Sequence, residues 1–204
     1  MDFLALENNL FTVAMVCYLI GMVLYFIFFG LKKAKMGDYG GYAMIVGFIF
    51  HTLALIFRSI GAGRLPLTNQ YEFATSFAWG INACFIFFLF KYKFKALGVF
   101  VSPIVFLVIG YAAMQSREVR ELMPALRSSW LAIHVSAAII GYGAFGVACA
   151  LGFMYLFREK MANNEFWKEH ILDEDHLDIL QYRAVSFGFL FLTFVMISGA
   201  IWAE

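Results

Sequence analysis

Six long stretches of the chain are almost free of charged side chains, and this feature limits the chain to one class of fold. A helix that crosses the hydrocarbon core of a bilayer needs about 20 mostly apolar residues. Stretches of that length occur at 10–31, 42–61, 72–90, 96–115, 129–157 and 184–203. They are too long for membrane strands and do not alternate between apolar and polar residues. We therefore predict an all-α integral membrane protein with about six transmembrane helices, in one polytopic membrane domain over residues 1–204.

The composition supports this prediction and argues against other classes of protein. Apolar residues make up 63% of the chain and charged residues 14%, against about 45–50% and about 25% in soluble domains. A water-soluble fold of this size would not cover so much apolar surface. The net charge is +1 and no basic patch stands apart from the helix ends, so a nucleic-acid partner is not expected. Three separate cysteines indicate neither a disulfide framework nor a zinc site: Cys17, Cys84 and Cys149.

Positive side chains between the helices predict the orientation, because loops rich in Lys and Arg stay in the cytoplasm. One side would hold Lys32, Lys33, Lys35, Lys91, Lys93, Lys95, Arg158, Lys160, Lys168 and Arg183. The other side would hold Arg64, Arg117, Arg120 and Arg127. The N-terminus is therefore predicted to lie outside, and so is the C-terminus. No cleavable signal peptide is predicted, and a short surface helix is expected at 173–182 in the inner loop 158–183.

His134 is the intramembrane polar residue whose position most favours a ligand role. It lies one turn after Trp130 in the predicted helix 129–157, about 6–8 Å below the outer end at 1.5 Å per residue. Small side chains on the same face allow close helix packing or a slot for a flat ligand: Ala137, Ala138, Gly141 and Ala148. Imidazole is a natural ligand of haem iron. The residues leave open a haem ligand, a proton relay and a histidine bonded to a backbone carbonyl.

The other histidines receive simpler interpretations. His51 lies near the middle of the helix 42–61, two turns from Arg58 and about 6 Å deeper than His134. The two imidazoles are therefore not expected to clamp one haem, and His51 is expected to be a packed, hydrogen-bonded residue. His170 and His176 lie in the inner loop and are expected to be solvated.

Polar and aromatic residues of the helix 72–90 and its surroundings also have structural explanations. Glu72 at the start of this helix is stabilised by the helix dipole. Asn82 is expected to form a hydrogen bond to a neighbouring helix. Tyr71, Trp130 and Trp202 are expected in an aromatic belt at the outer membrane interface.

Three segments of the chain resemble the cytochrome c assembly family, in particular its CcsA (ResC) branch of the System II machinery. Residues 64–79, RLPLTNQYEFATSFAW, are similar to the PLSNLYES…W stretch of that family. Residues 128–156, SSWLAIHVSAAIIGYGAFGVACALGFMYL, are similar to its WLxxHV…GYAAF helix. The third segment is LDILQYRAVSFGFLFLTFVMISGAIWAE, at residues 177–204. The resemblance covers most of the chain after about residue 48 and depends on the order and spacing of all three segments.

This resemblance implies a function in cytochrome c-type biogenesis, namely binding of haem b at the outer membrane face and its delivery for covalent attachment to apocytochrome c. His134 matches the histidine of the WLxxHV motif and would be an axial ligand of the haem iron. Trp130 would lie beside it, and outer-loop arginines would pair with the haem propionates: Arg117, Arg120 and Arg127. No catalytic side chain is predicted, although the family implies a place in a haem lyase (synthetase) complex.

The same resemblance implies partners and a location. The partners would be a ResB-like (CcsB) membrane protein, apocytochrome c and the lipid bilayer. The protein would be a multi-pass protein of the cell inner (plasma) membrane with its functional face in the periplasm. Family members continue after the sequence that matches GAIWAE into a tryptophan-rich WWD segment and a second outer histidine. We therefore expect residues 1–204 to be the N-terminal portion of a longer family member or one of two chains.

Three alternatives are carried forward. A HemX-like membrane regulator of haem synthesis would use the inner loop 158–183 as its working surface. A b-type cytochrome that carries electrons would need paired histidines at matching depth. A structural membrane subunit would bind no ligand and would be colourless when purified.

Overall fold

All six predicted membrane helices are present in the computed structural model, which describes residues 2–119 and 129–203, with the backbone alone at 129, 202 and 203. They are α1 (Phe3–Leu31), α2 (Ala34–Ala62), α3 (Gln70–Tyr92), α4 (Gly98–Ala113), α5 (Ser129–Ala162) and α7 (Glu174–Ala203). A 3₁₀ turn, η1 (Lys95–Leu97), leads into α4, and a short helix, α6 (Glu165–His170), follows α5. By length and composition, all six long segments are able to cross a membrane.

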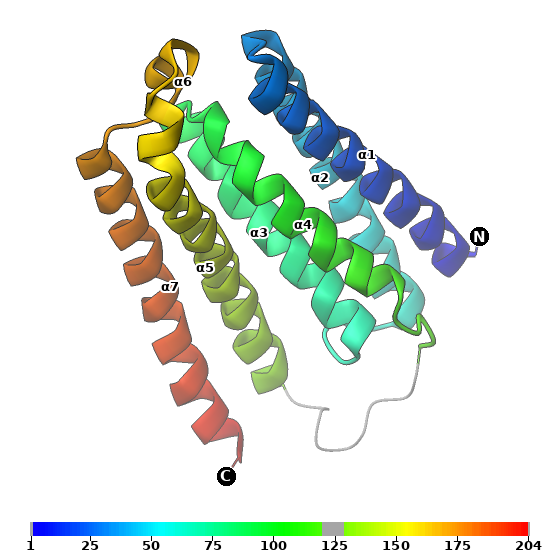
Figure 1. Cartoon of the computed structure of the whole chain (residues 1–204). Coiled ribbons are helices and arrows are strands. Elements are labelled where there is room, and N and C mark those ends of the chain that lie inside the picture. Colours follow the sequence, from blue (N-terminus) through cyan, green and yellow to red (C-terminus); the bar gives the residue numbers. More distant parts are fainter. Residues whose placement is uncertain (1, 120–128, 204) are drawn as a thin grey trace.

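The helices stand side by side in one array (Figure 1). α1 packs on α2 at one edge, α3 and α4 form the centre, and α5 connects the centre to α7 at the other edge. Successive long helices alternate in direction, so both termini and the connection between α2 and α3 lie at one end. This end is called the terminal end below, and the other the opposite end. The predicted orientation makes the terminal end the outer one.

Three helices begin earlier than their apolar stretches predicted, and a side-chain cap explains the start of α1. This helix begins at Phe3 instead of residue 10, because the Asp2 carboxylate accepts the N–H groups of Leu4 and Ala5 at 3.1 Å. α2 begins at Ala34 instead of residue 42 without a side-chain cap. The helical structure there extends past the apolar stretch into the basic segment that follows α1.

The third early start is that of α7, where the separate surface helix expected at 173–182 was wrong. Among the described residues, this segment forms the first turns of α7 instead of a helix of its own. α7 starts early because the Asp173 carboxylate accepts the His176 N–H at 2.9 Å. The short helix of this loop is α6, which precedes it.

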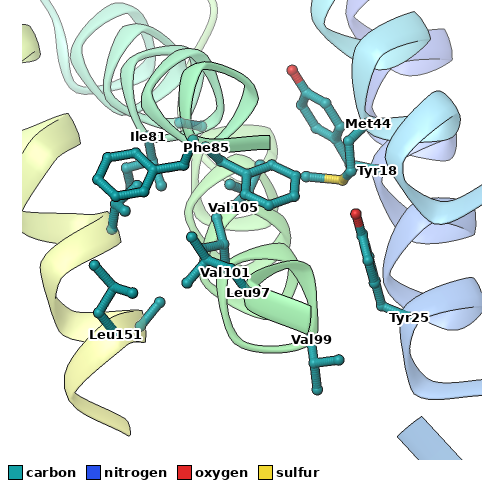
Figure 2. Packing of buried hydrophobic residues seen from close by; sticks show 14 of the residues in the cluster. Tyr18, Tyr25, Met44, Ile81, Phe85, Leu97, Val99, Val101, Val105 and Leu151 are labelled. Carbon is teal, nitrogen blue, oxygen red and sulfur yellow. The ribbon is translucent and has the colours of Figure 1, made fainter. Parts of the chain in front are cut away.

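The core lies where α1, α3, α4 and α5 meet (Figure 2). Fully buried side chains from these helices and α2 interdigitate there: Tyr18, Tyr25, Met44, Ile81, Phe85, Val101, Val105 and Leu151. Glycine sets the closest helix approach. A Cβ atom added to Gly143 would lie 2.7 Å from the carbonyl carbon and oxygen of Gly80, so α5 and α3 touch backbone to backbone.

The outward-facing surface is apolar, as a surface in contact with lipid has to be. Leu107 and Leu190 are about two-thirds exposed, and most of the large exposed side chains of the long helices are of the same kind. Only a small share of the residues of α7 is buried within the chain. The helix therefore relies chiefly on α5 for its contacts.

Candidate functional site

His134 lies on α5 at the terminal end, where its ring faces α7. Its Nδ1 is 3.2 Å from the Ser198 hydroxyl oxygen, and the imidazole is partly buried. Ser198 is 1% exposed. The histidine is thus held at the α5–α7 interface by a side chain 64 residues away, a partner that the sequence pattern did not indicate.

The hydrogen bonds around Ser198 are compatible with one tautomer of the His134 imidazole in particular. The Ser198 hydroxyl lies 3.1 Å from the Val195 carbonyl oxygen, to which it donates its one proton. The Ser198 oxygen is then available to accept from His134, and this arrangement corresponds to a neutral imidazole with its proton on Nδ1 and its lone pair on Nε2. This is the form in which a histidine with an oriented Nδ1–H binds a metal, and His134 therefore fits the role of a haem iron ligand.

The small residues near His134 serve close packing between α5 and α7. A Cβ atom on Gly141 would lie 3.3 Å from the Gly188 carbonyl oxygen, and one on Gly199 would lie 3.0 Å from His134 Cε1. Ala137, Ala138 and Ala148 are also buried. Of the two interpretations of this stripe, helix packing is the one that the geometry of Gly141 and Gly199 supports.

The structure separates the predicted site residues into two groups. Trp130 lies one helical turn before His134 and is 40% exposed. Arg117 lies instead against α1 and α3, with its guanidinium 4.5 Å from the Phe11 ring centre and 5.2 Å from that of Tyr71. It also donates to the Asn8 side chain. Arg120 and Arg127 lie outside the described residues.

A buried cluster of charges, which the sequence pattern did not assemble, occupies the terminal end between α1, α2 and α3. Arg58 of α2 donates from Nε and Nη2 to Glu72 of α3 at 3.1 and 3.0 Å. Its Nη1 lies 3.8 Å from Glu7 of α1. None of these three side chains is more than 3% exposed. The cluster joins three helices through one guanidinium group.

Further hydrogen bonds from neighbouring groups stabilise this cluster. The second Glu72 oxygen accepts from Arg64 at 2.9 Å and from the backbone N–H and the hydroxyl of Thr68 at 3.0 and 2.9 Å. Arg58 also donates to the Arg117 carbonyl oxygen at 2.8 Å. The cluster therefore anchors the beginning of the segment that follows α4.

Two interpretations of residues in this region change as a result. Tyr71 is buried and donates its hydroxyl proton to Glu7, so the prediction of an interfacial aromatic belt was wrong for Tyr71. Glu72 does lie in the first turn of α3, as the dipole interpretation requires, but it also forms the ion pair with Arg58. An arginine within an apolar helix indicates a buried partner of opposite charge. The position of Arg58 in the sequence therefore indicates that such a partner exists, but not that it is Glu7 or Glu72.

His51 belongs to a different interface from that of His134. It is completely buried, its Nδ1 lies 3.1 Å from the Tyr18 hydroxyl of α1, and the Phe11 ring meets it edge-on. The expectation of a packed, hydrogen-bonded residue is confirmed. Since His51 faces α1 and His134 faces α7, these two histidines do not form the pair that a b-type cytochrome would need.

The remaining polar expectations had mixed outcomes. Asn82 donates to the Met44 carbonyl oxygen of α2 at 3.1 Å, which confirms the predicted hydrogen bond between helices. His176 is exposed, as expected. His170 is partly buried and stacks on Phe166 with ring centres 4.2 Å apart, so the expectation of a solvated side chain was wrong for His170. Among the described residues, no group of three or more His, Cys, Asp and Glu side chains is arranged to hold a metal ion.

Comparisons with known proteins agree with this architecture and with the resemblance in sequence. Residues 67–204 match the family described as cytochrome C assembly protein. The whole chain aligns with 74% of a cytochrome c biogenesis protein CcsA from Guillardia theta at 30% identity. Proteins of the same name from Chlorella vulgaris and Prochlorococcus marinus are 30% and 29% identical over 75% and 76% of the chain. The chain spans 60% and 59% of the lengths of these last two relatives.

Proposed function

Because the chain belongs to the cytochrome c assembly protein family, we propose that it holds haem b for cytochrome c biogenesis, with Nε2 of His134 as an axial ligand of the iron. The observation that carries this proposal is the chain of hydrogen bonds from His134 to Ser198 to the Val195 carbonyl. This chain of hydrogen bonds supports a tautomer with the proton on Nδ1 and the lone pair on Nε2, which coordination of a metal through Nε2 requires. The site would lie at the terminal end, which the distribution of Lys and Arg predicts to be the outer face.

The protein would act by positioning and orienting a reactive group. When bound, haem supplies the iron and the vinyl groups that become attached to the cysteine thiols of an apocytochrome. Ser198 fixes the proton of His134 on Nδ1 and restrains the rotation of the ring. The absence of a side chain at Gly199 leaves room for the imidazole edge. Trp130, one turn away and 40% exposed, offers a flat apolar surface beside it.

The three arginines of the segment that follows α4 are not equally suited to pair with the haem propionates. Arg117 is stacked over two aromatic rings and bonded to Asn8. Arg120 and Arg127 are therefore the stronger candidates for pairing with propionates, and the Arg58–Arg117 hydrogen bond would hold the start of their segment in place. A ResB-like (CcsB) membrane protein and apocytochrome c are the partners that family membership suggests.

The test is the visible absorption spectrum of the protein purified in mild detergent from a host that makes its partners. In the wild type we expect sharp bands of six-coordinate reduced haem. His134→Gly should lose them, and imidazole added to the buffer should restore them by occupying the vacated coordination position. His176→Ala, which alters an exposed histidine of the opposite end, is the control and should leave the spectrum unchanged.

Ser198 provides a second, more specific comparison. Ser198→Ala removes the acceptor for Nδ1–H, and loss of such an outer-shell partner weakens metal binding by about 10–100-fold. Ser198→Thr keeps the hydroxyl and should retain most of the affinity. A wild type that binds haem with a spectrum unaffected by His134→Gly would rule out His134 as the ligand. A wild type without haem in this host would favour the HemX-like regulatory alternative.

A further inference from the structure

An apolar groove lies at the opposite end of the bundle, far along the helices from His134. It has a volume of about 800 Å³ and is formed by the end of α1, the beginning of α4 and the end of α5. Trp167 of α6 closes the groove at the end nearest α6, and the centre of its ring lies 5.2 Å from the centre of the Phe29 ring. The groove is open to the surface that the lipid would cover.

Two phenylalanines and one lysine line the groove from each of two helix ends. Phe26 and Phe29 lie three residues apart on one face of α1, and Lys32, the residue directly after this helix, also lines the groove. On α5, Phe153, Phe157 and Lys160 follow one another at intervals of four and three residues, so they share one face. α1 and α5 run in the same direction, so both stripes end in a lysine at the same end of the bundle. Lys160 lies about 5 Å beyond Phe157 along the axis of α5.

Two lysines carry the charges among the side chains that line the groove. Lys32 and Lys160 are both exposed, and neither forms an ion pair with a described carboxylate. The residues that line the groove include no Asp or Glu. A smaller groove of about 180 Å³ at the same end differs in this respect, because Lys95 there pairs with Asp38. The larger groove therefore offers two lysines and no carboxylate, whereas the smaller one offers Lys93 and Lys95 together with the carboxylate of Asp38.

From this geometry we propose that the groove binds one anionic phospholipid, with its phosphate between Lys32 and Lys160 and its acyl chains along the two phenylalanine stripes. Basic pockets between transmembrane helices on the cytoplasmic side are suited to anionic headgroups. The distribution of Lys and Arg predicts that this end is cytoplasmic. The inference does not depend on the proposed haem site.

Native mass spectrometry of the purified chain, with dioleoyl phosphatidylglycerol or dioleoyl phosphatidylcholine added, tests the charge recognition. We expect one phosphatidylglycerol molecule to be retained at least tenfold more tightly than phosphatidylcholine. The double variant Lys32→Gln/Lys160→Gln should lose this preference. The control, Lys91→Gln/Lys93→Gln, removes two charges at the same end. It includes Lys93, which ends α3 in the same left-handed conformation as Lys32 ends α1, and it should keep the preference. Equal retention of the two lipids, or an unaffected Lys32/Lys160 variant, would overturn the proposal.

Two further variants separate a lipid from a protein partner. Gly30 lines the groove, and a Cβ atom there would meet nothing within 4 Å. Gly30→Leu should therefore fill the groove without changing its charge, and it should reduce phosphatidylglycerol retention while leaving thermal stability intact. Phe157→p-benzoylphenylalanine, irradiated in native membranes, should yield an adduct of lipid mass. A protein adduct at that position would show that a partner helix occupies the groove and would refute the lipid assignment.

Discussion

Arg58 and Glu72 form an ion pair through two hydrogen bonds to one carboxylate oxygen, at 3.1 and 3.0 Å, and neither side chain is more than 2% exposed. The pair joins α2 to α3, and Glu7 extends it to α1. A buried pair of this kind need not contribute net stability compared with apolar side chains, but the loss of Arg58 takes from buried Glu7 the cation that it faces and leaves Glu72 with Arg64 alone.

Arg58→Ala should therefore lower the free energy of unfolding by about 3–5 kcal/mol, measured by denaturant titration in detergent micelles. Lys35→Ala, at an exposed position, is the control and should change it by less than about 0.5 kcal/mol. The double variant Arg58→Met/Glu72→Gln should lower the free energy of unfolding by less than the sum of the two single changes. The reason is that it removes the carboxylate of Glu72 together with the guanidinium that pairs with it. A loss below about 1 kcal/mol for Arg58→Ala would contradict this account of the cluster.

Gly143→Ala should destabilise the protein by about 1–3 kcal/mol, because the new methyl group would overlap the backbone of Gly80 and force α5 away from α3. Gly110→Ala in α4 is the matched control, since its Cβ would meet nothing within 4 Å. Better helix propensity should make that variant neutral or up to about 1 kcal/mol more stable. Thermal unfolding of both variants in detergent checks the difference, and equal midpoints would argue against a backbone contact between α3 and α5.

Tyr18→Phe should cost about 1–3 kcal/mol, because it leaves the Nδ1 of the completely buried His51 without the hydroxyl partner seen here. His51→Leu added to Tyr18→Phe should recover part of this loss, since both polar partners are then removed. Tyr42→Phe, at a tyrosine that is 63% exposed, serves as the control. If the changes in the free energy of unfolding of the two single variants add up to that of the double variant, the two side chains are not coupled.

The start of α7 should depend on pH through Asp173. The N–H of His176 donates to the Asp173 carboxylate and is the main reason that the pKa of this group lies below its ordinary value of 3.8. A lowered pKa means that the cap is fully formed above pH 3.8 and is lost as the pH falls through the lower folded-state pKa. The His176 amide proton shift in an NMR titration should therefore move below pH 3.8 in the wild type. Asp173→Asn, whose side chain caps without titrating, should lack this transition below pH 3.8. A midpoint above 3.8 would contradict the prediction.

The fold was predictable from the sequence because lipid imposes a strict rule on length and composition. Every backbone polar group in a bilayer needs an internal partner, so long apolar stretches become helices. Most of the predicted helix ends were correct to within about one turn. The larger errors occurred where a helix continues into polar sequence, at the starts of α1, α2 and α7. Asp2 and Asp173 cap two of these starts, and hydropathy does not register caps, since they act through single hydrogen bonds.

The candidate site was only partly predictable. The WLxxHV resemblance and the cost of a polar residue at membrane depth both directed attention to His134. Neither indicated Ser198, because the sequence does not state which helices become neighbours. Arg117 was grouped with His134 by its side of the membrane alone, whereas its side chain rests on Phe11 and Tyr71. The charge of a side chain and its place in the sequence predict the side of the membrane on which it lies, but only the packing of the helices decides which helix it contacts.

The sequence by itself determined that this chain is a membrane protein, how many long apolar helices it forms and which family it resembles, because these properties depend on local apolar length and on motifs read in order. Only the tertiary structure decided that Glu7, Arg58 and Glu72 meet, that Ser198 orients His134, and that two phenylalanine stripes end in lysines beside one groove. These relationships join residues from different helices. They follow from which helix faces pack together, and small residues such as Gly80, Gly141 and Gly143 set those contacts through close approach.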